Sequence, residues 1–84
     1  MLLQPSLYNK ILGDAKYSAN TIDDAVTPGI FSANDLQFGF VLQYNNDNQF
    51  QFVIKLKSGT HNLEFVKCRR RASGVWGDFI VLGQ

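Results

Sequence analysis

Residues 49–57 read Gln-Phe-Gln-Phe-Val-Ile-Lys-Leu-Lys, and this stretch decides the fold. Large apolar residues occupy its even positions, namely Phe50, Phe52, Ile54 and Leu56. Polar residues occupy all but one of its odd positions, namely Gln49, Gln51, Lys55 and Lys57. A period of two is typical of a half-buried strand. We expect the apolar face to anchor the core, at roughly 1.5 to 3 kcal/mol per large side chain, and the polar face to meet water, a ligand or another subunit. Val53, alone among apolar residues on that face, hints at a partner.

A second strand is predicted directly before this one. Residues 36–44 again place apolar side chains at even positions, with Gly39 where a side chain would point to the other face. The four turn-forming residues 45–48 separate the two strands, which predicts an antiparallel hairpin with a four-residue loop. Further along, the pattern predicts a turn at 58–61, a strand over 62–70, a turn at 72–74 and a last strand over 76–82.

The N-terminal part of the chain is predicted to add one short helix. Residues 7–12 have apolar side chains at helical spacing, and Gly13 supplies a stop. Such a short helix must pack on the sheet or on another copy of the chain. Residues 14–20 are predicted to be a connector, and Pro28-Gly29 a type II turn leading into a strand at Ile30.

The predicted fold is therefore mainly β, an antiparallel meander of about five strands with one short N-terminal helix. Residues 1–17 would form a helical and connecting segment, and residues 18–84 a β domain. At 84 residues, the chain buries only roughly 60 to 65% of its unfolded surface, so modest monomer stability is expected and oligomerisation is a common remedy.

Composition excludes several classes of function. Eight basic and seven acidic residues give a net charge of +1, which provides no global field for nucleic acid or an anionic membrane. One Cys and one His cannot form an internal disulfide or a typical zinc site, so we expect neither metal nor cofactor. No apolar run approaches the roughly 18 residues of a membrane span. Residues 1–5 lack the features of a signal peptide, so we do not expect export by that route.

Catalytic chemistry has few candidate residues. Asp23 and Asp24 precede a turn, and we expect them to hydrogen-bond turn backbone in preference to forming an acid-base dyad. His61 lies in a predicted turn and should face solvent. Cys68 lacks an identifiable partner and should be a buried or inert thiol. No phosphate loop, nucleophile elbow or metal-spaced cluster occurs, so we expect no enzyme.

The basic run at residues 67–71, Lys-Cys-Arg-Arg-Arg, supports two hypotheses. With Tyr44, Phe65 and Trp76 as stacking surfaces, it could bind the phosphates and bases of nucleic acid in a small β-barrel protein. It could also be a solvated edge strand whose charges discourage association. We favour the edge strand, because the acidic residues cancel the positive charge over the whole domain.

The order of motifs along the chain resembles the pyocin-knob domains of phage and R-type pyocin tail fibres. The resemblance covers about residues 18–82. Its elements are Ser18-Ala19-Asn20, Ile22-Asp23-Asp24, Thr27-Pro28-Gly29-Ile30-Phe31, the apolar strand with Gly39, the Gln-rich strand 49–54, Arg70 or Arg71, and Trp76-Gly77-Asp78-Phe79. The family typically closes on Trp-Ser-x-Trp, so Gly77 and Phe79 are departures.

This resemblance implies a non-catalytic virion module, made in the host cytoplasm, of tail-fibre, head-fibre or adaptor type. It implies a homo-oligomer, most commonly a trimer, with other virion proteins and bacterial surface glycan as partners and with neither membrane nor nucleic acid. Trp76 and the strand aromatics would then form the core, and any ligand would meet the loops. The candidate ligand or partner contacts are Asn46, Asp47, Gln49, Gln51, His61, Arg69, Arg70, Arg71 and Trp76.

Overall fold

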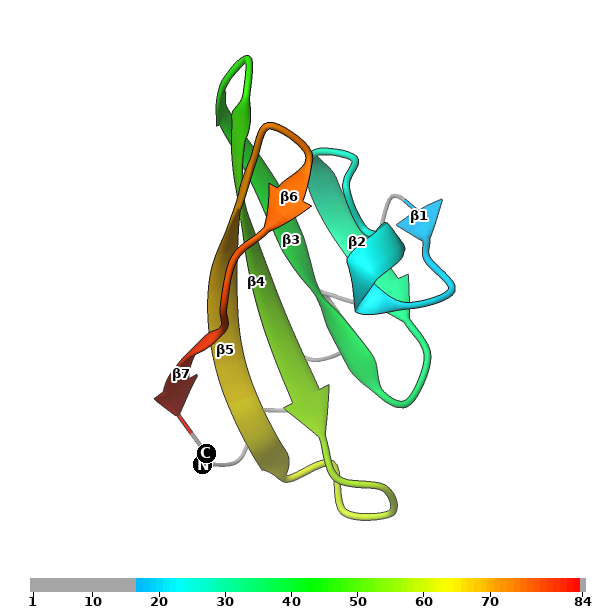
Figure 1. Cartoon of the computed structure of the whole chain (residues 1–84). Helices are drawn as coiled ribbons and strands as arrows, with labels where there is room; N and C mark the ends of the chain where they lie inside the picture. Colours follow the sequence, from blue (N-terminus) through cyan, green and yellow to red (C-terminus); the bar gives the residue numbers. More distant parts are fainter. Residues whose placement is uncertain (1–16, 84) are drawn as a thin grey trace.

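The computed structural model describes residues 17–83 as one seven-stranded sheet (Figure 1). Its elements are β1 (Tyr17–Ser18), the 3-10 helix η1 (Ile22–Asp24), β2 (Gly29–Ala33), β3 (Gln37–Asn45), β4 (Asn48–Leu56), β5 (Leu63–Ala72), β6 (Val75–Trp76) and β7 (Ile80–Gly83). The strands are ordered β1-β2-β3-β4-β5-β6, and β7 also pairs with β5. The mainly β prediction is confirmed, whereas the predicted helix at residues 7–12 lies outside the described residues.

The prediction of a purely antiparallel meander is wrong for the first strand. Tyr17 and Ser18 pair in parallel with Phe31 and Ser32 of β2, so the sheet is mixed. These two residues had been assigned to a connector, because a two-residue strand carries no period that a sequence can show. The predicted last strand is also divided, since β6 and β7 pair separately with β5. Gly29 has a positive φ of 127°, the sign that a type II turn requires of its second central residue, but it is already the first residue of β2, so the strand begins one residue before the predicted Ile30.

The central hairpin is confirmed, with a tighter turn than predicted. Asn45 and Asn48 are already paired, which leaves only Asn46 and Asp47 to connect β3 with β4. The Asn45 side-chain oxygen accepts hydrogen bonds from the Asp47 backbone N–H at 3.0 Å and from the Asn48 amide at 2.7 Å. An asparagine that bonds the backbone two residues ahead stabilises such a turn locally.

The alternation along β4 is confirmed, but its buried face was assigned wrongly over most of the strand. Gln51 and Val53 are fully buried and Gln49 is 7% exposed, whereas Phe50 is 37% exposed. Val53 packs in a cluster with Ala25, Phe31 and Val41. We expected Val53 to contact a partner, but its apolar contacts are made within the core of its own chain.

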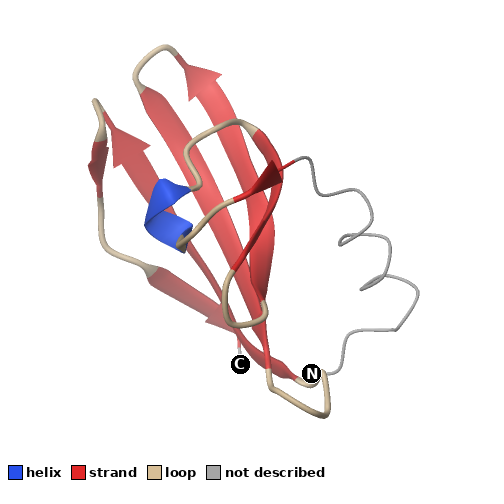
Figure 2. Cartoon of the chain, turned by 90° about the vertical axis from the view of Figure 1, so that its right-hand side faces the viewer, coloured by secondary structure: helices blue, strands red, loops and turns tan. Residues whose placement is uncertain are grey.

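The segment between β1 and β2 explains this reversal. It carries η1 across one face of the sheet, as both views show (Figures 1 and 2). Its backbone carbonyls do not belong to a strand ladder, and buried carbonyls require donors. The Gln49 amide donates to the Val26 carbonyl at 2.7 Å, and the Gln51 amide donates to the carbonyls of Ile22 and Ala25. The polar face of β4 is buried because it binds this segment.

A second buried cluster lies toward the turn between β4 and β5. It contains Phe38, Leu56 and Leu63, with Ile54 and Val66 packed against it. At this end of β4, the apolar residues at even positions do form core as predicted. Within residues 17–83, the core is thus divided between two clusters.

The edge-strand prediction for residues 67–71 is wrong. β5 pairs with β4 on one side and with β6 and β7 on the other, so it is an interior strand. Cys68 is buried there, as expected. Among the three arginines, only Arg70 is exposed.

Candidate functional site

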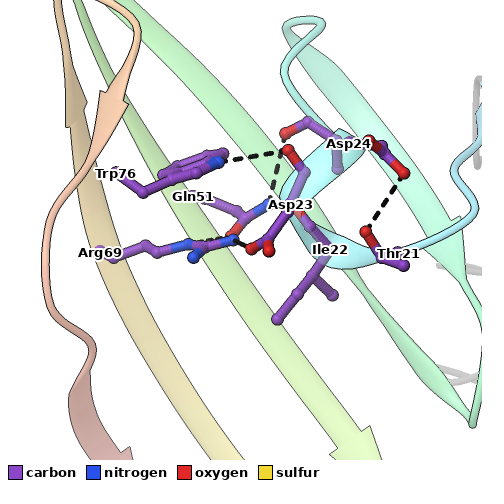
Figure 3. Close-up of polar contacts among 8 residues, drawn as sticks. Thr21, Ile22, Asp23, Asp24, Gln51, Arg69 and Trp76 are labelled. Atoms are coloured by element: carbon purple, nitrogen blue, oxygen red, sulfur yellow. Dashed lines mark hydrogen bonds and ion pairs between the residues drawn. The ribbon is translucent and has the colours of Figure 1, made fainter.

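A buried arginine organises the covered face of the sheet (Figure 3). Arg69 of β5 is only 7% exposed. Its Nε donates to Gln51 Oε1 on β4 at 2.8 Å, and its Nη2 lies 2.6 Å from Asp23 Oδ1 in η1. Charge-assisted hydrogen bonds of this kind offset the cost of burying a guanidinium group. The three residues therefore join η1 to two adjacent strands.

Aromatic rings complete the surroundings of Arg69. Its guanidinium carbon lies 3.9 Å from the centre of the Trp76 ring and 4.2 Å from that of Phe79. The Trp76 indole N–H donates to the Asp23 backbone carbonyl at 3.2 Å. Arginine is well suited to such stacking because its guanidinium is planar and weakly hydrated. Trp76 is half-buried and belongs to neither buried cluster, so the prediction that it forms the core with the strand aromatics is wrong; it contacts Arg69 and η1 at the edge of the covered face.

The two neighbouring aspartates have separate partners. Asp23 is paired with Arg69, whereas Asp24 accepts a hydrogen bond from the Thr21 hydroxyl at 3.2 Å. We had expected both carboxylates to bind turn backbone, but the structure gives each of them a side-chain partner. Nothing in the local sequence indicates the Asp23–Arg69 contact, which spans 46 positions in the chain.

A polar hollow lies at the end of the sheet where the β3–β4 and β5–β6 turns meet. Its volume is about 390 Å³, and it is lined by Gln43, Asn46, Asp47, Gln49, Arg71, Ser73 and Gly74. The Ser73 N–H donates to the Asp47 carbonyl at 2.8 Å, which ties the two turns together. In Figure 1 both turns are at the top, and the β4–β5 turn is at the bottom. The volume falls within the roughly 300 to 1,000 Å³ of ordinary ligand pockets.

An apolar surface occupies the opposite face of β3 and β4, and we call it the aromatic strip. It consists of Phe40, Leu42, Tyr44, Phe50 and Phe52. The Phe40 and Phe52 rings stack at 4.7 Å, and the Tyr44 and Phe50 rings at 5.3 Å. Four of the five side chains are 37 to 51% exposed, with Phe52 half-buried. Contiguous exposed apolar residues mark contact surfaces more often than scattered ones do.

The predicted contact residues separate into four groups. Four of them line the hollow, namely Asn46, Asp47, Gln49 and Arg71. Three belong to the buried network, namely Gln51, Arg69 and Trp76. Arg70 is on the opposite face and donates to Asn48 Oδ1 at 3.1 Å, while His61 is exposed in the distant β4–β5 turn. The sequence prediction missed Asp23 and Gln43, whose roles depend on tertiary contacts.

The basic run does not form a continuous cationic surface. The side chains of Lys67, Arg69 and Arg71 lie over aromatic rings of residues near the end of the chain or within β5. Arg69 is also buried and paired. A phosphate backbone requires several accessible cations in a row, and this arrangement gives the nucleic-acid hypothesis little support.

Lys67 is expected to titrate below 10.5, the ordinary pKa of a lysine side chain. Burial lowers its pKa, and the positive charges of Arg69 and Lys55 lower it further. The folded state disfavours the charged form of Lys67, which lowers the free energy of unfolding at neutral pH. This loss of stability is relieved as the pH rises through the folded pKa toward 10.5. An NMR titration of the Lys67 Cε resonance would measure this directly. A midpoint at or above 10.5 would contradict it.

Within residues 17–83, no group of three or more His, Cys, Asp or Glu side chains could hold a metal ion. The same part of the chain contains no helix of the length and hydrophobicity that crossing a membrane requires. A second hollow of about 360 Å³ is lined by Arg70, Ala72, Val75, Trp76 and Gly77.

Comparison of the chain with protein-family models, with curated proteins and with solved structures finds no match.

Proposed function

We propose that this protein is a non-catalytic structural module of a phage virion, of tail-fibre, head-fibre or adaptor type, that assembles as a homo-oligomer and binds host-surface saccharide. The motif order shared with pyocin-knob domains suggests the particle. The aromatic strip is the observation that carries the assembly part of the proposal. The hollow supports the binding part.

A second copy of this chain is the proposed occupant of the aromatic strip. A sheet buries its two faces against other elements or subunits, and the face opposite η1 leaves four large apolar side chains well exposed. A small domain gains stability by burying such residues against identical chains. Leu42 and Phe50 are cross-strand partners at the exposed end of the strip, so they would be central to that contact.

Solution mass tests the assembly proposal. We expect the wild-type chain at micromolar concentration to have a mass above that of one 9.5 kDa chain, with three chains favoured. Replacing Leu42 and Phe50 together by Lys should give a folded monomer, because charges in an apolar interface are costly to desolvate. Sedimentation equilibrium would measure the mass, and circular dichroism would check the fold.

Val75→Lys is the matched control for that experiment. Val75 is another exposed apolar residue, but it lies on β6 outside the strip, so its replacement should leave the mass unchanged. A wild-type monomer that binds neither virion proteins nor bacterial envelope glycans would count against the whole proposal.

A further inference from the structure

Two glutamine–arginine pairs stand next to each other on the covered face of β4 and β5. Gln51 is opposite Arg69, and Gln49 is opposite Arg71. In the first pair, the Arg69 Nε–H donates to Gln51 Oε1 at 2.8 Å. In the second pair, Gln49 Oε1 and Arg71 Nε are buried, and among the described residues neither has a hydrogen-bond partner. The Arg69–Gln51 pair is thus hydrogen-bonded, which we call closed, whereas the corresponding atoms of the Arg71–Gln49 pair are unsatisfied, which we call open.

The orientation of the Gln49 amide is fixed by its surroundings. Its Nε2 donates to the Val26 carbonyl at 2.7 Å and to Gln43 Oε1 at 2.6 Å, which uses both of its hydrogens. Turning the amide over would place its oxygen against two acceptors. Gln49, which is 7% exposed, therefore presents a fixed acceptor, and Arg71 presents a donor.

Gln49 and Arg71 both line the polar hollow. Their two unsatisfied atoms are themselves buried, so a group bound in the hollow completes the pair after a side-chain movement exposes them. That group must donate to Gln49 Oε1 and accept from Arg71 Nε, because an unsatisfied buried polar atom costs about 1 to 3 kcal/mol. A hydroxyl group does both. A carboxylate can only accept, and it would also face the Asp47 carboxylate in the lining. An ammonium group can only donate, which leaves Arg71 unsatisfied.

We infer that the hollow is a binding site for a neutral polyhydroxy ligand of the saccharide class, with one ligand hydroxyl bridging Gln49 Oε1 and Arg71 Nε. The remaining lining groups, Asn46, Asp47, Gln43 and Ser73, offer further hydrogen bonds to neighbouring hydroxyls. This inference rests on the glycan-binding part of the proposed function and specifies its site and ligand class.

NMR titration of the full-length ¹⁵N-labelled chain tests the site. The probes are methyl α-glucoside and methyl β-galactoside as neutral sugars, glucuronate as an acidic sugar and glucosamine as an amino sugar. We expect at least one neutral glycoside to shift the Arg71 Nε–H and Gln49 side-chain amide resonances saturably. Glucuronate and glucosamine should bind at least tenfold more weakly.

Two neighbouring variants make the test specific. Arg71→Leu should weaken binding of the neutral glycoside at least tenfold, whereas Arg70→Leu, on the opposite face, should leave its affinity within twofold. Tighter binding of glucuronate would overturn the inference in favour of an anion site. If none of the four sugars moves these resonances, the pair is closed by direct contact or by water only, and the inference fails. The solution mass is unaffected by either result, so the assembly proposal succeeds or fails separately.

Discussion

Replacing Gly39 by Ala is expected to destabilise the sheet by roughly 3 kcal/mol or more. A Cβ at this position would lie 1.8 Å from the carbonyl oxygen of Phe52 on the adjacent strand, and 2.8 Å from its carbonyl carbon. The obstacle is backbone in the central β3–β4 pair, so no side-chain rotation relieves it. Because small domains are only about 5 to 15 kcal/mol stable, this loss is a large fraction of the total.

Urea unfolding followed by the fluorescence of the single Trp76 would measure the effect of Gly39→Ala. Gly83→Ala is its control, since a Cβ on Gly83 of β7 meets nothing within 4 Å. We expect the control to change the free energy of unfolding by no more than about 0.5 kcal/mol. Equal stability of the two variants would mean that β3 and β4 are not as closely paired at Gly39 as described.

Replacing Arg69 by Met is expected to lower the free energy of unfolding by about 2 to 4 kcal/mol. The change leaves the buried Gln51 Oε1 without its donor and removes the group that stacks on Trp76 and Phe79. The Asp23 side chain is 68% exposed, so it can be rehydrated, and the ion pair itself should contribute little. The loss therefore comes mainly from the buried side of the network.

Arg70→Met is a matched control for Arg69→Met, one position along the same strand. Arg70 is exposed on the other face, with a hydrogen bond to Asn48 at 3.1 Å, so we expect a change within about 0.5 kcal/mol. Urea unfolding would again give both values. The Trp76 emission of the folded state should change more in Arg69→Met than in Arg70→Met, because the Arg69 guanidinium lies directly on that ring. Similar losses in both variants would contradict the described network.

The period of two was the reliable part of the sequence prediction. It gave the two central strands and their antiparallel pairing, because side-chain alternation is a local consequence of strand geometry. It could not say which face is covered. Phe50 appeared to be core because it is apolar, yet it is 37% exposed, while Gln51 is fully buried. The preference of a side chain for water is overridden when a buried backbone needs its hydrogen bonds.

The candidate site was predictable in part. Asn46, Asp47 and Gln49 could be placed near the tip of the central hairpin, because adjacent positions and a turn bring them together. The approach of Arg71 from β5 was not predictable, since residues 57–62 between the strands do not specify register. The contact between Asp23 and Arg69 likewise joins two segments that only the folded chain brings into reach.

The sequence by itself determined the central strands, their hairpin and the positive φ at Gly29, because each depends on residues within one short stretch. Only the tertiary structure decided which face of β4 is buried along most of its length. The segment that carries η1 crosses one face, and its carbonyls are bound by Gln49 and Gln51. That choice buries Arg69, opens the hollow beside Arg71 and leaves the aromatic strip on the opposite face. No local sequence pattern encodes long-range contacts of this kind. The candidate functional site is built from them, so it could not be predicted in full from the sequence.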